Sequence, residues 1–188
     1  MGFTRAELRS FQDASLPDLI APGLKLLFVG INPGLWTAAT QTHFAHPANR
    51  FYPALRRAGI IDRTFDLNVG MTDEDRRYLG ERGIGNTNLV NRATARADEL
   101  TAAELRLGRL RLQDLVTRHQ PLVVAIAGIT AYRTAFGQRS VTTGEQPDAL
   151  IAARLWVVPN PSGLNAHETI DTLAEAYAEP ARAAGVIR

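Results

Sequence analysis

The stretch LKLLFVGINPG, residues 24–34, joins a short apolar run to a turn of Asn, Pro and Gly. Two further runs, Leu122 to Ala127 and Leu155 to Val158, are equally rich in valine, isoleucine and leucine, and they also end at glycine or proline. Such runs are typical of parallel strands that are buried on both faces. We therefore expect strands over 24–29, 122–127 and 155–158, with 149–152 as a candidate partner of the last one.

Helical segments separate these runs. The pairs Thr4 with Glu7 and Thr101 with Glu104 have capping-box spacing, which predicts helices that begin near residues 5 and 102. Further helices are expected at four places: 50–58, after the cap Thr72, 131–136 and 166–184. Because parallel strands need crossover connections, this alternation predicts an α/β fold with a mainly parallel sheet and helices on both of its faces.

The composition predicts one cytoplasmic domain. With 188 residues, of which 45% are apolar, the chain can bury one substantial core, so we expect a single domain over 1–188 with 1–20 as an N-terminal helical extension. The absence of cysteine excludes disulfides, thiol nucleophiles, thiolate zinc sites and iron–sulfur clusters. The N-terminus has no signal-peptide pattern, and the longest apolar run, 122–128, is too short to span a bilayer.

The charge balance permits a nucleic-acid partner without requiring one. The net charge is +2, and the 21 basic residues are nearly all arginine, whose planar guanidinium can bind two phosphate oxygens. Arginines on solvated helix faces would give the same composition, so both interpretations remain open at this point.

Two strand ends carry the same turn chemistry. In parallel α/β sheets ligands bind at the carboxyl ends of the strands, and here residues 30–35 and 159–165 both place Asn-Pro beside glycine. Glycine permits close approach to a ligand, and an asparagine amide can orient a water molecule or bond the edge of a base. An ordinary turn is the alternative for either segment alone. The sequence after Gly34 excludes a P-loop, and the glycine spacing excludes a dinucleotide fingerprint.

Three segments in order carry a family resemblance. GINPGL at 30–35, FAHPANRF at 44–51 and the stretch 156–164 together resemble the mismatch-specific uracil-DNA glycosylases of the uracil-DNA glycosylase superfamily, whose eukaryotic relatives are the thymine-DNA glycosylases. The resemblance runs from about residue 21 to residue 177. It implies a three-layer α/β/α sandwich with a short, mainly parallel central sheet.

The resemblance also implies a function. It is the excision of uracil, and of ethenocytosine or related damaged pyrimidines, from mismatched double-stranded DNA, especially opposite guanine. The enzyme would hydrolyse the N-glycosidic bond as a monomer, without metal or cofactor, and leave an abasic site for downstream repair enzymes. It would act in a bacterial-type cytoplasm, at the nucleoid, with no membrane partner.

The resemblance assigns a role to each candidate residue. Asn32 would hold the attacking water, Phe44 would stack on the extruded base, and backbone groups around Ile31 and Phe44 would read its edge. Asn88 and Asn160 are further candidates for base binding. Core packing is the alternative for Phe44, and a cap or turn is the alternative for Asn88.

The segment Gly163-Leu164-Asn165 is expected to enter the duplex, where Leu164 would fill the gap left by the base. Extruding a base costs a few kcal/mol, which stacking and an apolar wedge can offset. Faster relatives carry an aspartate and a histidine where this chain has Asn32 and Asn160. We therefore expect a slow enzyme that depends on binding and preorganisation. Trp36 and Thr37 stand where smaller residues are expected, and the branch that accepts thymine cannot be distinguished from a strict uracil branch.

The remaining polar residues show no metal-site pattern, because the aspartates at 62, 66, 73 and 75 have no ligand spacing with His43 or His46. His46 could contact a phosphate or orient the Phe44 loop. Arg50 lies near a helix start and could bind an anion there. Asn49 could equally be the cap of that helix. Two other functions stay open: a non-catalytic protein that binds DNA lesions, and a hydrolase of free nucleosides.

Overall fold

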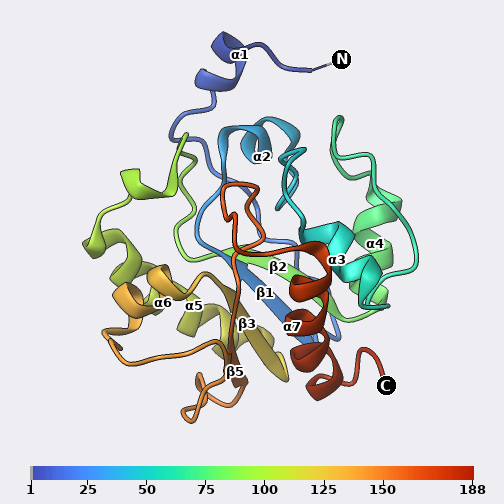
Figure 1. Ribbon diagram of the computed structural model, residues 1–188, viewed down its shortest axis with the longest axis vertical. Helices are drawn as coiled ribbons and strands as arrows, with labels where there is room; N and C mark the ends of the chain where they lie inside the picture. Colours follow the sequence, from blue (N-terminus) through green and yellow to red (C-terminus); the bar gives the residue numbers. More distant parts are fainter. Residues whose placement is uncertain (1) are drawn as a thin grey trace.

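A five-stranded sheet forms the centre of the computed structural model, which describes residues 2–188 (Figure 1). Its order is β2-β1-β3-β5-β4; β2, β1, β3 and β5 run parallel, whereas β4 is antiparallel to β5. The strands are β1 (Leu26–Gly30), β2 (Ile84–Asn88), β3 (Val123–Ala127), β4 (Gly144–Glu145) and β5 (Arg154–Val158). The three strands expected from apolar runs are confirmed with ends shifted by one or two residues, as is the mainly parallel α/β architecture.

Seven α-helices surround the sheet within the described residues: α1 (Arg5–Arg9), α2 (Leu35–Thr40), α3 (Phe51–Arg57), α4 (Asp73–Glu81), α5 (Ala102–His119), α6 (Ile129–Phe136) and α7 (Ile170–Ala183). A short 3-10 turn spans Ala97–Glu99. The capping boxes that begin at Thr4 and Thr101 are confirmed, and Thr72 makes one with Asp75. Within residues 2–188, none of the helices combines the length and apolar character needed to cross a bilayer.

The helix expected over 166–184 begins later than predicted. The Thr169 hydroxyl accepts from the Thr172 N–H at 3.1 Å, so α7 starts at Ile170 and residues 166–169 belong to the preceding loop. A threonine in that geometry satisfies an orphan N–H of the first turn, which fixes the start of the helix.

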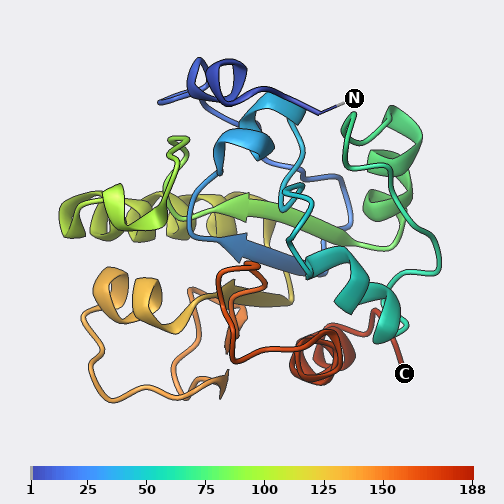
Figure 2. The same ribbon diagram turned by 45° about the horizontal axis from the view of Figure 1, so that its top comes forward.

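Alternate side chains of the central strands enter two separate cores. Leu26 and Phe28 pack with α3 and α7 on one face, whereas Leu27 and Val29 pack with α5 and α6 on the other. Figure 2 shows these helices on opposite sides of the sheet. Burial on both faces explains why the strands are continuously apolar rather than alternating, and it confirms the basis on which they were predicted.

Strand β2 was missed from sequence because it is polar. All five residues of Ile84–Asn88 are buried, and the strand pairs with β1 along its whole length. Its polar side chains find partners far along the chain: the Thr87 hydroxyl donates to Asp18, and the Asn88 amide contacts His43. Buried polar groups are tolerated when they are paired, so tertiary contacts explain this strand where hydrophobicity cannot.

The expected partner of β5 was also wrong. Residues 149–152 do not pair with β5; the edge strand is Gly144–Glu145, and Leu150 pairs with Ala153 in an isolated bridge. The chain turns back on itself there, with Ile151 in the left-handed region at φ 58°. A segment that reverses within four residues cannot run alongside another strand.

Candidate active site

Three strand ends meet at the carboxyl edge of the sheet. A Cβ atom at Gly128, which follows β3, would lie 3.1 Å from Cδ1 of Ile31 and 3.9 Å from Nδ2 of Asn160. These two neighbours follow β1 and β5, the strands on either side of β3. The carboxyl ends of β1 and β5, which carry the two Asn-Pro turns, are therefore neighbours in space.

The Asn32 side chain is fixed at its amide end. Its Nδ2 lies 2.9 Å from the Arg92 carbonyl oxygen, 2.7 Å from the Thr94 hydroxyl and 3.1 Å from the Pro33 carbonyl oxygen. Carbonyl oxygens only accept hydrogen bonds, so the nitrogen must face them. Among residues 2–188, Oδ1 has no hydrogen-bond partner, yet it is not one of the buried orphan atoms, so solvent reaches it. Asn32 thus presents an oriented acceptor to the solvent side.

The segment that holds Asn32 is itself anchored. The Arg92 guanidinium donates to Glu104 and to Asp13, each at 2.8 Å, and the Thr94 hydroxyl donates to the Arg96 carbonyl at 2.7 Å. The hydrogen bond from Arg92 lowers the pKa of Glu104 to about 2, so the carboxylate stays ionised. Thr94 could not be recognised from the sequence, because its partner Asn32 lies 62 residues away.

Phe44 offers a partly covered ring and free backbone groups. The ring is half-buried and stacks on Phe51, with centroids 4.0 Å apart. Its φ of 57° is uncommon for a bulky residue, and such conformations gather at functional sites. Within the described chain neither its N–H nor its C=O has a hydrogen-bond partner, whereas the preceding carbonyl, of His43, accepts from the Tyr52 hydroxyl at 3.0 Å. Core packing therefore covers part of the ring and leaves the rest exposed.

Asn88 lies beside Phe44 because position 30 has no side chain. A Cβ at Gly30 would lie 2.5 Å from Oδ1 of Asn88 and 3.3 Å from the Phe44 ring. Asn88 ends β2 with 5% of its surface exposed, and its Nδ2 lies 3.2 Å from Nδ1 of His43. Its side chain therefore makes neither the cap nor the turn that was the alternative. His43 had no signal in the sequence beyond its place next to Phe44.

The second turn presents the most exposed of the large apolar side chains in the described chain. Leu164 is 88% exposed at the tip of a tight loop. Asn160 Oδ1 accepts from the Ser162 N–H at 3.0 Å, and Asn165 Nδ2 donates to the Asn160 carbonyl at 3.1 Å. A Cβ at Gly163 would lie 2.7 Å from the Ala48 carbonyl oxygen, so glycine lets this loop pack directly against the 44–51 segment.

Arg50 braces the same loop. Its guanidinium donates to the carbonyls of Ser162 and Asn165, each at 2.7 Å, and to that of Glu168, while its own N–H donates to the Pro161 carbonyl at 3.0 Å. Figure 1 shows the two segments side by side above the sheet. The side chain considered as a possible anion ligand is therefore committed to backbone carbonyls.

The neighbours of Arg50 have local roles. His46 Nδ1 accepts from the Ala48 N–H at 3.1 Å, which orients the loop after Phe44. Asn49 Oδ1 accepts from the Phe51 N–H at 2.9 Å and so caps the start of α3. The His46 contact matches one of the two roles considered for it from sequence, and the Asn49 contact matches the cap considered there.

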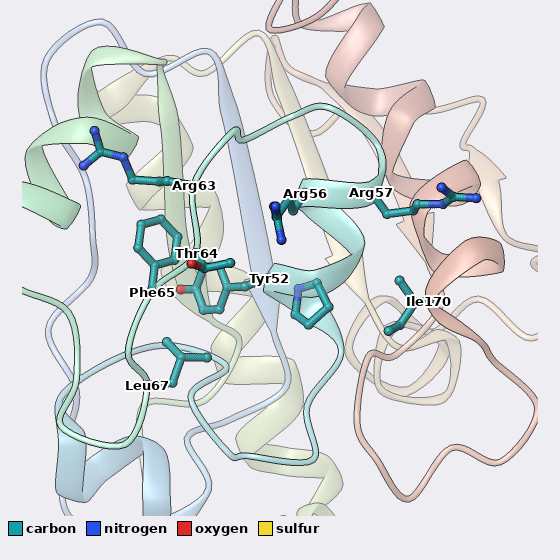
Figure 3. Close-up of a pocket in the computed structure, with 9 residues that line it drawn as sticks. Tyr52, Arg56, Arg57, Arg63, Thr64, Phe65, Leu67 and Ile170 are labelled. Atoms are coloured by element: carbon teal, nitrogen blue, oxygen red, sulfur yellow. The ribbon is translucent and has the colours of Figure 1, made fainter.

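A cavity with a volume of about 510 Å³ lies elsewhere. It is lined from α3, the segment 63–67 and the start of α7 by Tyr52, Pro53, Arg56, Arg57, Arg63, Thr64, Phe65, Leu67 and Ile170 (Figure 3). Two of its arginines are paired, Arg57 with Asp171 and Arg63 with Glu74, and no residue predicted for the site lines it. The polar groups held in fixed orientations therefore favour the sheet edge over this cavity as the candidate site. Residues 2–188 contain no cluster of three or more His, Asp or Glu able to hold a metal ion.

Comparisons with known proteins show the family and the fold of this chain. The family model of the Uracil DNA glycosylase superfamily matches residues 17–180. Among solved structures, the chain is similar to a solution NMR structure from Methanosarcina acetivorans described as a "putative Uracil DNA glycosylase", with a TM-score of 0.57 and 14% identity. That similarity covers 90% of this chain and 96% of the other, and at this identity it shows the fold alone.

Proposed function

Because the chain belongs to the uracil DNA glycosylase superfamily, we propose that it is a monofunctional, mismatch-specific glycosylase that removes uracil from double-stranded DNA, especially opposite guanine. It hydrolyses the N-glycosidic bond of the extruded nucleotide and leaves an abasic site for downstream repair enzymes. Ethenocytosine and related damaged pyrimidines are the proposed secondary substrates. The protein acts as a monomeric single domain and uses no metal or cofactor.

The observation that carries this proposal is the Asn32 carboxamide, with its nitrogen bonded and its oxygen free. In the proposed reaction, Oδ1 accepts a hydrogen bond from the attacking water. This bond orients the water so that a lone pair of the water oxygen points at C1′ of the sugar. The C1′–N1 electron pair leaves with the base while the water oxygen bonds C1′ and its proton passes to solvent or to the base. A carboxamide is too weak a base to take that proton, so orientation is its contribution.

The base would be held between Phe44 and three nearby polar groups. Stacking on the exposed side of the Phe44 ring would return about 1 to 3 kcal/mol toward the cost of extrusion. Ile31 would contribute its N–H, because its carbonyl already accepts from the Val90 N–H at 3.0 Å. Asn160 would contribute Nδ2, because its Oδ1 is taken by the Ser162 N–H, and Asn88 would contribute Oδ1.

The loop of Gly163, Leu164 and Asn165 would enter the duplex behind the extruded base. An exposed leucine side chain gains free energy when base pairs cover it, and apolar wedges of this kind unstack and kink DNA. The hydrogen bonds from Arg50 support this role, because a loop that inserts between base pairs must keep its conformation when it contacts the duplex.

Excision from a G·U duplex tests the proposal, with abasic sites read out by alkaline strand cleavage. Asn32→Ala should reduce single-turnover excision by about 100- to 1,000-fold while lesion binding persists, as when a fixed catalytic hydrogen bond is removed. The matched control is Asn68→Ala, because Asn68 lies in an exposed loop and bonds Asp66.

Two results would favour the other functions. Lesion binding with intact bases in the wild type would indicate a non-catalytic binder, and hydrolysis of free deoxyuridine with little salt dependence would indicate a nucleoside hydrolase. Binding to DNA should weaken steeply as salt rises, because phosphate contacts release counterions.

A further inference from the structure

His43 is buried between two polar groups that determine which of its nitrogens carries the proton. It is 3% exposed, with Nε2 3.1 Å from the Pro17 carbonyl oxygen and Nδ1 3.2 Å from Nδ2 of Asn88. A carbonyl oxygen can only accept, so Nε2 must carry the hydrogen. A neutral imidazole has one N–H, which leaves Nδ1 as an acceptor.

This tautomer fixes the direction of the Asn88 carboxamide. Nδ1 offers a lone pair, so the amide nitrogen must face it, and an oxygen in that place would be repelled. Asn88 Oδ1 therefore faces the other way, toward Gly30 and the Phe44 ring. Among residues 2–188 this oxygen has no hydrogen-bond partner, and it is not one of the buried orphan atoms. The site thus contains a fixed acceptor beside the ring proposed to stack on the base.

We propose that His43 is a positioning residue that sets base specificity by holding Asn88 Oδ1 toward the base pocket; this rests on the proposed function. A fixed acceptor selects a base whose edge offers an N–H. Uracil has one at N3, whereas cytosine has a lone pair there and ethenocytosine has N3 closed into its second ring. The enzyme should therefore prefer bases with an imide N–H, with uracil above ethenocytosine.

A pair of His43 variants separates orientation from bulk. His43→Leu keeps apolar volume but removes both hydrogen bonds, which frees the Asn88 amide to rotate. His43→Asn can place a carboxamide oxygen near the position of Nδ1 and so keep the bond to Asn88. The measurement is single-turnover kcat/KM for uracil and for ethenocytosine, each opposite guanine, with circular dichroism to confirm folding.

The ratio of the two rates is the decisive readout. His43→Leu and Asn88→Leu should each lower the uracil-to-ethenocytosine ratio by about 10- to 100-fold, the discrimination expected from one well-placed base contact, while His43→Asn retains most of it. Equal losses on both bases would mean a structural role and overturn the proposal. If His43→Leu does not fold, His43→Asn and Asn88→Leu still decide the question.

Two measurements separate this inference from the proposed reaction. Binding of duplexes with 2′-fluoro-2′-deoxyuridine or 2′-fluoro-2′-deoxycytidine, whose glycosidic bonds resist hydrolysis, should show the same preference without turnover, and its loss in His43→Leu. Imidazole nitrogen NMR shifts should show the hydrogen on Nε2. Equal affinity for the two duplexes, or a hydrogen on Nδ1, would overturn the inference even if uracil is excised. Failure to excise uracil alone would count against the proposed function.

Discussion

The two Asn-Pro turns at the sheet edge have the same dipeptide and use opposite ends of the carboxamide. In the first turn the Asn32 nitrogen bonds Arg92 and Thr94, 60 and 62 residues away, and the oxygen is left free. In the second turn the Asn160 oxygen accepts from the Ser162 N–H two residues on. The second turn has the geometry of an ordinary asparagine turn, whereas the first has become an oriented acceptor.

The difference shows that an Asn-Pro turn presents an oriented acceptor only when residues far along the chain bond the nitrogen end of the asparagine carboxamide. The two turns also gain their rigidity differently. The first is held through the asparagine side chain, and the second is held from outside by Arg50, which donates to three loop carbonyls. The following changes compare the two turns and the Phe44 loop that lies beside them.

Loss of the Arg50 brace should have the largest effect on stability. Hydrogen bonds from a charged donor contribute about 1.5 to 3 kcal/mol each, and water can replace part of that in an exposed loop, so Arg50→Leu should lower the unfolding free energy by about 3 kcal/mol. Chemical denaturation gives this value, and limited proteolysis should show new cleavage within 159–168. Arg56→Leu, at an exposed position of α3, the helix that follows Arg50, is the matched control and should change stability by less than about 0.5 kcal/mol. Protease resistance equal to the wild type would show that the loop is rigid without Arg50.

Acid should lower the stability of the protein by protonating His43, the buried residue that precedes Phe44. Burial lowers the pKa of His43 to about 4, partly opposed by its bond to Pro17 and by Asp18, while Arg76 and Arg111 add to the lowering. Because the unfolded chain binds this proton more readily, stability should be complete above about pH 6.5 and fall by about 3 kcal/mol as the pH drops to 4. Urea denaturation across this range measures the loss. His43→Leu should flatten the pH dependence in that window, and an unchanged slope would assign it to other groups.

Exchanging asparagine for aspartate at each turn should give the smallest changes in unfolding free energy, and it compares the two turns directly. Asn160→Asp keeps an oxygen that accepts from Ser162, so the unfolding free energy should change by less than about 0.5 kcal/mol. Asn32→Asp replaces a donor with a carboxylate that faces the Arg92 carbonyl, and it should cost about 2 kcal/mol. Thermal unfolding at neutral pH compares the two. Equal losses would mean that both turns hold their asparagines in the same way.

Apolar pattern and helix caps were sufficient to predict most of the fold. The strands at 24–29 and 122–127 and the helices that begin near residues 5 and 102 follow from local residue order, and the structure confirms them. Strand β2 could not be found this way, because its Asn and Thr side chains are buried only after distant partners satisfy them. The local apolar pattern indicates which side chains become buried, but it does not indicate which buried polar groups find hydrogen-bond partners.

The candidate site was predicted in part. The two turns were placed by the rule that ligands bind where parallel strands end, and the Phe44 segment was placed by the family resemblance; the structure brings them to one edge. Arg50 was misinterpreted, because a guanidinium near a helix start resembles an anion ligand until the loop carbonyls around it are seen. His43 was excluded as a metal ligand and given no other role.

By itself, the sequence determined which apolar segments become buried strands, where the helices capped by Thr4 and Thr101 begin and which two turns stand at the sheet edge. Only the tertiary structure decided which end of each carboxamide is free, which arginine supports the Leu164 loop and which tautomer orients Asn88. The reason is physical: burial depends on local apolar content, whereas hydrogen-bond direction depends on partners that lie dozens of residues away and meet only in the folded chain.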